Sequence, residues 1–234
     1  MHRILIYSLL ASIFGCTTSS DNSDTITFAF DFADSTEQWT GGFADYPVGE
    51  EDFFNLDFNR SSLPVPLDTN LQALRISGDN RSDDLFMFIK RKVDGLTPLA
   101  NYSLNLEIQL ASDSPEDAFG IGGGPGTSVF LKAGATGIEP VPILTEEPGF
   151  EDGYFRMNID RGNQSLGGDD MPVIGNIAHS NEEFEYTLIE RNLNNFTVQA
   201  SEKGELWLII GTDSGFEGTT TLYYSEIRAE LTEL

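Results

Sequence analysis

The stretch Tyr102-Ser103-Leu104-Asn105-Leu106-Glu107-Ile108-Gln109-Leu110 carries an apolar side chain at every second position. Successive side chains of a β-strand point to opposite faces of a sheet, so this period predicts a strand with one buried and one solvated face. Segment 25–32 repeats the period, with Ile26 and three phenylalanines on one side. The two stretches make all-β the predicted fold class.

Further strands are predicted where apolar residues alternate or run together between clusters of Gly, Pro, Asn and Asp. They are 71–77, 85–89, 128–133, 155–159, 184–190, 196–200, 206–210 and 222–231. About ten strands without a long amphipathic helix predict a single antiparallel β-sandwich of jelly-roll type over residues 25–234. Four long loops are also predicted, because connections longer than about 12–15 residues often carry function; they are 39–66, 113–126, 134–153 and 163–179.

Charge and composition exclude several classes of function. The 234 residues contain 38 Asp+Glu and 13 Lys+Arg, which gives a formal net charge of −25. A nucleic-acid-binding protein is excluded, because affinity for phosphates comes from clustered Lys and Arg. One Cys and two His exclude a zinc site of the usual Cys/His kind. The 39% hydrophobic residues suffice for a packed core.

Residues 1–15 predict a secretory signal peptide, because Arg3 precedes an apolar run, 4–14, that is too short to span a bilayer. The residues Ile13-Phe14-Gly15-Cys16 resemble the bacterial lipobox. The resemblance implies cleavage after Gly15 and lipidation of Cys16. It also implies a location in the bacterial cell envelope, as an outer-membrane lipoprotein on the periplasmic or surface face.

Residues 16–24 are polar and small, and we expect them to be a disordered tether. Removal of the signal peptide takes away one base, Arg3, which leaves 12 Lys+Arg against 38 Asp+Glu and a net charge of −26. An anionic membrane surface repels such a body, so the lipid is the predicted membrane contact.

Three stretches resemble the carbohydrate-binding, galactose-binding-like jelly-roll modules: 28–32 followed by Trp39, 95–110, and 222–228. The resemblance implies the same sandwich fold and a glycan ligand. The last strand of that family usually carries an Asp that helps to hold a structural calcium ion, whereas this chain has Ser225 there with Glu226 beside it. Asp31 and Glu226 are therefore the candidate ligands if Ca²⁺ is bound.

Sugar rings stack on aromatic side chains, so an exposed aromatic stretch is a candidate ligand platform. The polar, Gly-rich segment 39–54 supplies the candidate ligand-binding residues Trp39, Phe43, Asp45 and Tyr46, together with Phe53 and Phe54. A second segment holds Phe150 and Tyr154. The alternative interpretation is that these rings fill the ends of the sandwich.

No catalytic residue is predicted, because His179 has no accompanying nucleophile motif. The expected function is that of a lipid-anchored envelope protein that binds a glycan or a similar envelope ligand without turnover. Two alternatives are open: a polysaccharide-degrading enzyme on a jelly roll, and a structural or adhesive surface lipoprotein. No cofactor other than calcium is expected.

Overall fold

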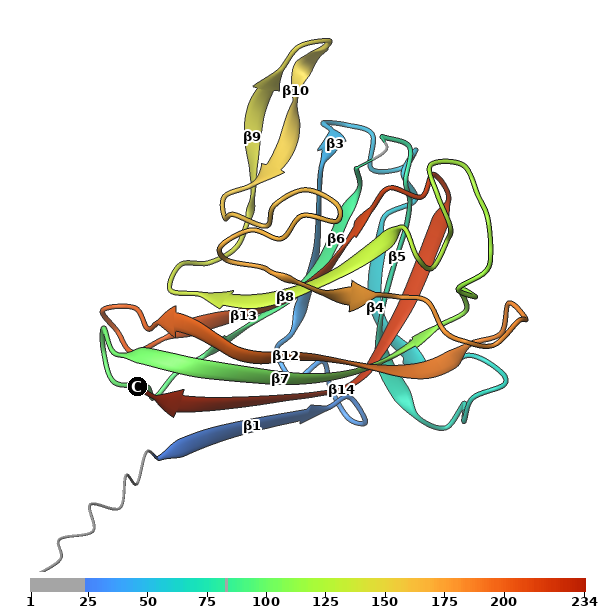
Figure 1. The fold of residues 1–234 in the computed structure, drawn as a ribbon. Helices are drawn as coiled ribbons and strands as arrows, with labels where there is room; N and C mark the ends of the chain where they lie inside the picture. Colours follow the sequence, from blue (N-terminus) through green and yellow to red (C-terminus); the bar gives the residue numbers. More distant parts are fainter. Residues whose placement is uncertain (1–23, 83) are drawn as a thin grey trace, which may run out of the picture.

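The computed structural model describes residues 24–82 and 84–234, which form an antiparallel β-sandwich of the predicted class (Figure 1). Sheet A consists of β1 (Thr25–Asp31), β4 (Asp57–Ser62), β5 (Gln72–Asp79), β7 (Asn101–Ser112), β12 (Thr187–Gln199) and β14 (Thr219–Glu233). Sheet B consists of β2 (Thr40–Ala44), β6 (Phe86–Val93), β8 (Val129–Thr136), β11 (Val173–Asn176) and β13 (Leu206–Ser214). A small sheet C consists of β3 (Tyr46–Pro47), β9 (Pro142–Glu147) and β10 (Phe150–Met157).

The long strand β14 organises sheet A, whose order is β12-β7-β14-β5-β4. One edge of β14 pairs with β7, while its other edge pairs with β5 along 219–224 and with β1 along 226–232. Sheet B has the order β11-β8-β13-β6-β2. Its strands cross behind those of sheet A in Figure 1, so the two sheets enclose the core between them.

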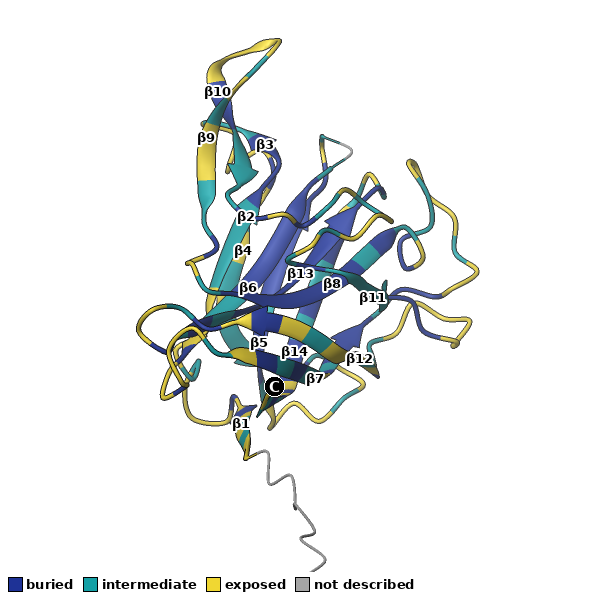
Figure 2. Ribbon diagram, turned by 60° about the vertical axis from the view of Figure 1, so that its left-hand side comes forward, coloured by how far each residue is buried: buried dark blue, intermediate teal, exposed yellow. Residues whose placement is uncertain are grey.

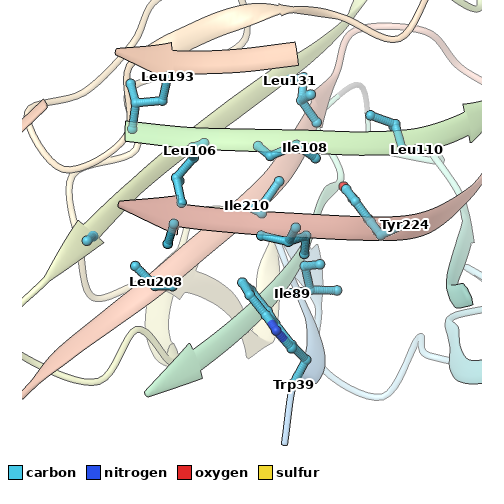
Figure 3. Close-up of a cluster of buried hydrophobic side chains, with 14 of the residues drawn as sticks. Trp39, Ile89, Leu106, Ile108, Leu110, Leu131, Leu193, Leu208, Ile210 and Tyr224 are labelled. Carbon is cyan, nitrogen blue, oxygen red and sulfur yellow. The ribbon is translucent and has the colours of Figure 1, made fainter. Parts of the chain in front are cut away.

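The core consists of the apolar positions that the period of two selects. Leu104, Leu106, Ile108 and Leu110 of β7 are each at most 1% exposed. Figure 3 shows the side chains of Leu106, Ile108 and Leu110 facing those of sheet B, with the ring of Trp39 at the edge of the cluster. Full burial of each such side chain contributes about 1.5–3 kcal/mol. Burial is deepest along the central strands of sheet B, which are dark blue in Figure 2.

The predicted strands 184–190 and 196–200 prove to belong to one long strand, β12. Its register with β7 shifts between Leu193 and Phe196, where a β-bulge accommodates one extra residue. Asn195 lies in this bulge at a φ of 55°, a left-handed conformation that Asn tolerates. Its backbone N–H donates to Oδ1 of Asn105 at 2.8 Å. The polar pair Asn194-Asn195 therefore interrupts the apolar alternation without ending the strand.

Three of the four predicted long loops contain strands, so the prediction of loops there is wrong. Segment 39–66 holds β2, β3 and β4, segment 134–153 holds β9, and segment 163–179 holds β11. These strands are two to six residues long, which is too short for a clear alternation, and β2 and β11 also contain Gly. Gly41 and Gly42 in β2 are needed because the rings of Phe58 and Phe88 occupy the places where a Cβ would lie.

Among the described residues, no helix has the length and apolar character that crossing a bilayer requires.

The sandwich has two distinct ends. At one end, Thr25 pairs with Thr232, so β1 begins next to the end of β14. The β9–β10 hairpin stands at the opposite end, as both Figure 1 and Figure 2 show.

The structure predicts opposite effects for two buried tyrosines. Tyr224 is fully buried and its hydroxyl has no hydrogen-bond partner among the described residues, so Tyr224→Phe should leave stability unchanged or raise it by about 1 kcal/mol. The hydroxyl of Tyr102 accepts from the N–H of Thr97 at 2.8 Å and donates to Glu233, so Tyr102→Phe should cost about 1–2 kcal/mol. Urea unfolding of both variants measures the difference, and equal losses would contradict it.

Candidate functional site

The predicted aromatic platform is buried. Trp39 is 1% exposed and meets Phe30 edge-on, with ring centroids 5.5 Å apart. Tyr46 is 7% exposed and packs against Phe155 at 5.2 Å, and Phe43 is half-buried against the same core. The prediction that these rings form an exposed surface is therefore wrong. These rings are buried because they lie on or next to β2 and β3, which are part of the sheets. The sequence does not reveal the two strands, because β2 contains two glycines and β3 has only two residues.

Asp45, the fourth predicted ligand residue, is also fully buried, at the junction of β2 and β3. Its carboxylate accepts from Nη1 of Arg156 at 2.7 Å and from Arg161. Burial raises the pKa of Asp45 despite these two arginines. Its backbone carbonyl accepts from the hydroxyls of Tyr154 at 2.7 Å and Ser82 at 2.9 Å. Asp45 therefore connects several segments inside the protein and is not part of an exposed platform.

Asp45 belongs to a buried network of alternating charges, which we call the ion network: Asp45, Asp84, Asp213, Lys132, Arg156 and Arg161. Asp213 and Lys132 have fully buried side chains whose charged atoms lie 2.8 Å apart. Arg161 binds both Asp213 and Asp45, and its guanidinium lies 4.8 Å from the ring centre of Phe86. Burial lowers the pKa of Lys132. Removing a fully buried member such as Lys132 or Asp213 costs about 3–5 kcal/mol, because a charge stays buried without its partner.

The ion network holds a segment that covers the outer face of sheet B, which we call the cover loop, residues 158–172. Nζ of Lys132 donates to the carbonyl oxygens of Arg161 at 2.8 Å and Leu166 at 3.0 Å. Gly134 of β8 leaves room for the carbonyl of Asp170, which lies where a Cβ would be. The carboxylate of Asp160 accepts from the backbone N–H groups of Gly162 and Asp169, and these bonds lower its pKa.

A groove of about 520 Å³ lies between the β9–β10 hairpin and the body, and we call it the hairpin groove. Phe53 and Phe150 stand in its walls, 57% and 41% exposed. The guanidinium of Arg81 lies 5.2 Å from the ring centre of Phe53, and the ring of Phe150 lies 5.1 Å from that of Tyr154. The described residues that line the groove are Pro47, Glu50, Phe53, Phe54, Arg81, Ser82, Asp84, Glu147, Phe150, Tyr154 and Arg156.

Arg156 connects the hairpin groove to the ion network. Besides Asp45, its guanidinium binds Asp84 at 3.1 Å and Glu147 at 3.5 Å, and it lies 4.4 Å from the ring centre of Tyr154. Burial, with Asp213 and Asp45 nearby, raises the pKa of Asp84 to about 6. The hairpin groove thus combines exposed ring faces with fixed hydrogen-bonding groups. These are the features that orient a ring-shaped, hydroxyl-rich ligand.

The candidate calcium ligands Asp31 and Glu226 lie directly opposite each other on β1 and β14. Both line a cavity of about 590 Å³ on the outer face of sheet A, together with Glu190 and Arg228. In the described part of the chain, no group of three or more Asp, Glu, His or Cys side chains is arranged to hold a metal ion. Calcium binding stays a prediction, as does lipidation of Cys16, which lies outside the described residues.

The hairpin groove is smaller than the cavity on the outer face of sheet A, which we call the sheet cavity. It is nevertheless the better candidate for a ligand site. Phe30 is the aromatic residue in the lining of the sheet cavity, and it is 5% exposed. The hairpin groove offers two exposed rings from separate segments. Of its residues, sequence analysis singles out Phe53, Phe54, Phe150 and Tyr154 as aromatic candidates. It misses Arg81, Asp84 and Arg156, which no motif marks.

No known protein family matches the chain, and no curated protein matches it significantly. Among solved structures it is similar to a putative sugar-binding protein from Bacteroides thetaiotaomicron, at 6% identity and a TM-score of 0.42 over 83% of this chain and 88% of that one. It is also similar to the mannan-recognising carbohydrate-binding module TmCBM27, at 13% identity and a TM-score of 0.37 over 88% and 97% of the two chains.

A third similar structure is the enzymatically active domain of bacteriophage CBA120 tailspike protein 4, at 11% identity and a TM-score of 0.39. The match covers 84% of this chain but only 19% of the tailspike chain. Carbohydrate-binding modules are thus among the structural neighbours, as the sequence resemblance predicts. At these TM-scores the neighbours assign neither a ligand nor an activity to this chain.

The raised pKa of Asp84 predicts a pH-dependent contribution to stability. A carboxyl group whose pKa is about 6 in the folded chain and 3.8 in a model compound binds its proton more tightly when folded. Its contribution is therefore most favourable below about pH 4 and is lost as pH rises to about 6. Asp84→Asn removes this titration, so the variant should gain stability relative to the wild type as pH rises from 4 to 7.

Urea unfolding of both proteins at several pH values in this interval tests the prediction. Asp117→Asn, in an exposed loop, serves as the reference for the loss of one surface charge. A stability difference between wild type and Asp84→Asn that does not change with pH would rule out the raised pKa.

Proposed function

We propose that this chain binds a glycan in the hairpin groove. The observation that carries the proposal is the pair of exposed rings, Phe53 and Phe150, which line one groove from two separate segments. The C–H faces of a sugar stack on such rings, while its hydroxyl groups need donors and acceptors nearby. Arg81, Asp84 and Arg156 line the same groove and supply them.

The proposed activity is binding without turnover, and the state of the carboxylates favours it over hydrolysis. Asp84 and Glu147 both line the hairpin groove, and a glycosidase uses two carboxyl groups about 5–10 Å apart. Both are bound by Arg156, and Oδ1 of Asp84 is shielded from solvent. A carboxylate oxygen that already accepts from Arg156 is poorly placed to activate water.

Glycan binding predicts a specific loss of affinity on removal of a groove ring. Phe150→Ala should weaken binding to a glycan-array ligand or a soluble polysaccharide about tenfold, because exposed rings dominate such contacts. Phe119→Ala is the matched control, since Phe119 is 97% exposed in the β7–β8 loop and does not line the groove. Array binding and affinity electrophoresis measure both variants.

The outcomes separate the alternatives. Release of shorter products from a polysaccharide panel would contradict binding without turnover and support an enzyme. A wild-type protein that binds no glycan, or a Phe150→Ala variant that binds as well as the wild type, would contradict the proposal and favour a structural or adhesive role.

We further propose that the protein is anchored to the bacterial outer membrane through lipid on Cys16. The described sandwich begins with β1 at the end opposite the β9–β10 hairpin (Figure 1). An anchor that leads into β1 would hold the hairpin groove on the side away from the membrane. A net charge of −25 agrees with this arrangement, because the acidic body has no attraction to an anionic membrane surface.

Lipidation predicts that cells expressing the full chain incorporate radioactive palmitate into it and retain it in the membrane fraction. Cys16→Ala should abolish the labelling and release the protein from the membrane, because Cys16 is the single thiol of the chain. Thr17→Ala keeps the thiol and should be labelled normally. Labelling of Cys16→Ala at the wild-type level would refute this anchor.

A further inference from the structure

A second, smaller cavity lies next to the hairpin groove, at the start of the cover loop. It has a volume of about 240 Å³. Asp84 and Arg156 line both cavities, so the two cavities meet at this ion pair. The remaining lining residues of the smaller cavity are Asp45, Met157, Ile159, Asp160, Arg161, Gly162 and Asn163.

The sizes of the two cavities are compatible with one ligand that occupies both. The hairpin groove, at about 520 Å³, lies within the range of about 300–1,000 Å³ that is usual for small-molecule sites. The smaller cavity, at about 240 Å³, lies below that range. It is therefore better suited to one further unit of a ligand that already occupies the groove.

The two cavities differ in chemistry. The hairpin groove has aromatic walls, whereas the described lining of the smaller cavity contains no aromatic ring. Asp160, Asn163 and the backbone of Gly162 offer donors and acceptors there, beside the apolar side chain of Met157. A ligand that fits both has a ring face for stacking in one part and hydroxyl groups for hydrogen bonding in the next. A chain of linked sugars has both features.

The rim of the smaller cavity is already ordered. The carboxylate of Asp160 accepts from the N–H groups of Gly162 and Asp169, each at 3.0 Å. The backbone of Asn163 exchanges two hydrogen bonds with that of Leu166, at 3.0 and 2.9 Å. Arg161 is fixed by the ion network. Little backbone entropy is therefore lost in this segment when a ligand binds, and this favours binding.

We propose that residues 157–163 form a second sugar subsite. The ligand is then an oligosaccharide that extends from Phe150, past Asp84 and Arg156, to Asn163. This inference rests on the glycan binding proposed for the hairpin groove. It adds that the length of the sugar chain is recognised, with stacking at one end and hydrogen bonding at the other.

The test uses calorimetric titration of the folded protein with xylo-, manno- and cello-oligosaccharides of one to six sugar units. Affinity should increase with length until both cavities are filled. Asn163→Ala spares the Asp160 carboxylate that holds the loop. It should weaken binding of the longest bound oligosaccharide about fivefold, as expected for one lost hydrogen bond, and leave the shortest bound one unaffected. Asn181→Ala, in the exposed β11–β12 connection, is the matched control.

Each outcome is decisive. Affinity that is independent of length, or a loss in Asn163→Ala that is equal for short and long oligosaccharides, overturns the second subsite and leaves glycan binding by the groove intact. No binding at any length in any of the three series, together with an empty glycan array, overturns glycan binding and the subsite with it. Phe150→Ala separates the two cavities further, because it should weaken short and long oligosaccharides alike.

Discussion

Asp45 and Asp213 have fully buried carboxylates, and their charges must be compensated where they lie. Removing a carboxylate from water costs several kcal/mol unless cations bind it. The cations come from three places: Lys132 from β8, Arg156 from β10 and Arg161 from the cover loop. No single segment can therefore satisfy the network. Folding therefore brings sheet B, the hairpin and the cover loop together around these charges. A buried apolar cluster also joins the cover loop to sheet B, where Ile159 and Met171 pack with Phe86, Phe88 and Ile209.

The same interaction determines the geometry of the hairpin groove. The guanidinium of Arg156 binds Asp45 inside the protein, and it also reaches Asp84 and Glu147, which line the groove. A side chain held at so many points cannot easily change its rotamer. The polar wall of the groove is consequently rigid, while its rings, Phe53 and Phe150, stay in contact with solvent. Because the polar groups are already rigid, little side-chain entropy is lost when a ligand binds between them and the accessible rings.

The sequence predicts a strand where alternating apolar side chains define one buried face. It does not predict the parts of the structure that depend on pairing between distant charged residues. Strands β1 and β7 follow from their alternation, but β2 and β9 are too short and too rich in Gly or charge to show it. Aromatic composition points to segments 39–54 and 150–154, yet it does not distinguish a ring in a strand from a ring at a turn. Lys132 within an apolar run is the one local sign of the network, and its partners lie 29 and 81 residues away.

The contrast between buried and exposed rings follows from the two faces of the β9–β10 hairpin. Phe155 points to the core, where it packs on Tyr46, so the base of the hairpin is part of the sandwich. Tyr154 lies on the other side, and its hydroxyl donates to the carbonyl of Asp45. Beyond this fixed base the strand carries Phe150 out past the body, where no core is available to cover it. The base of the hairpin is held on both faces, by Phe155 and by Tyr154. The exposed ring of Phe150 is therefore carried by a fixed strand, and a fixed position is what a ring needs to recognise a ligand.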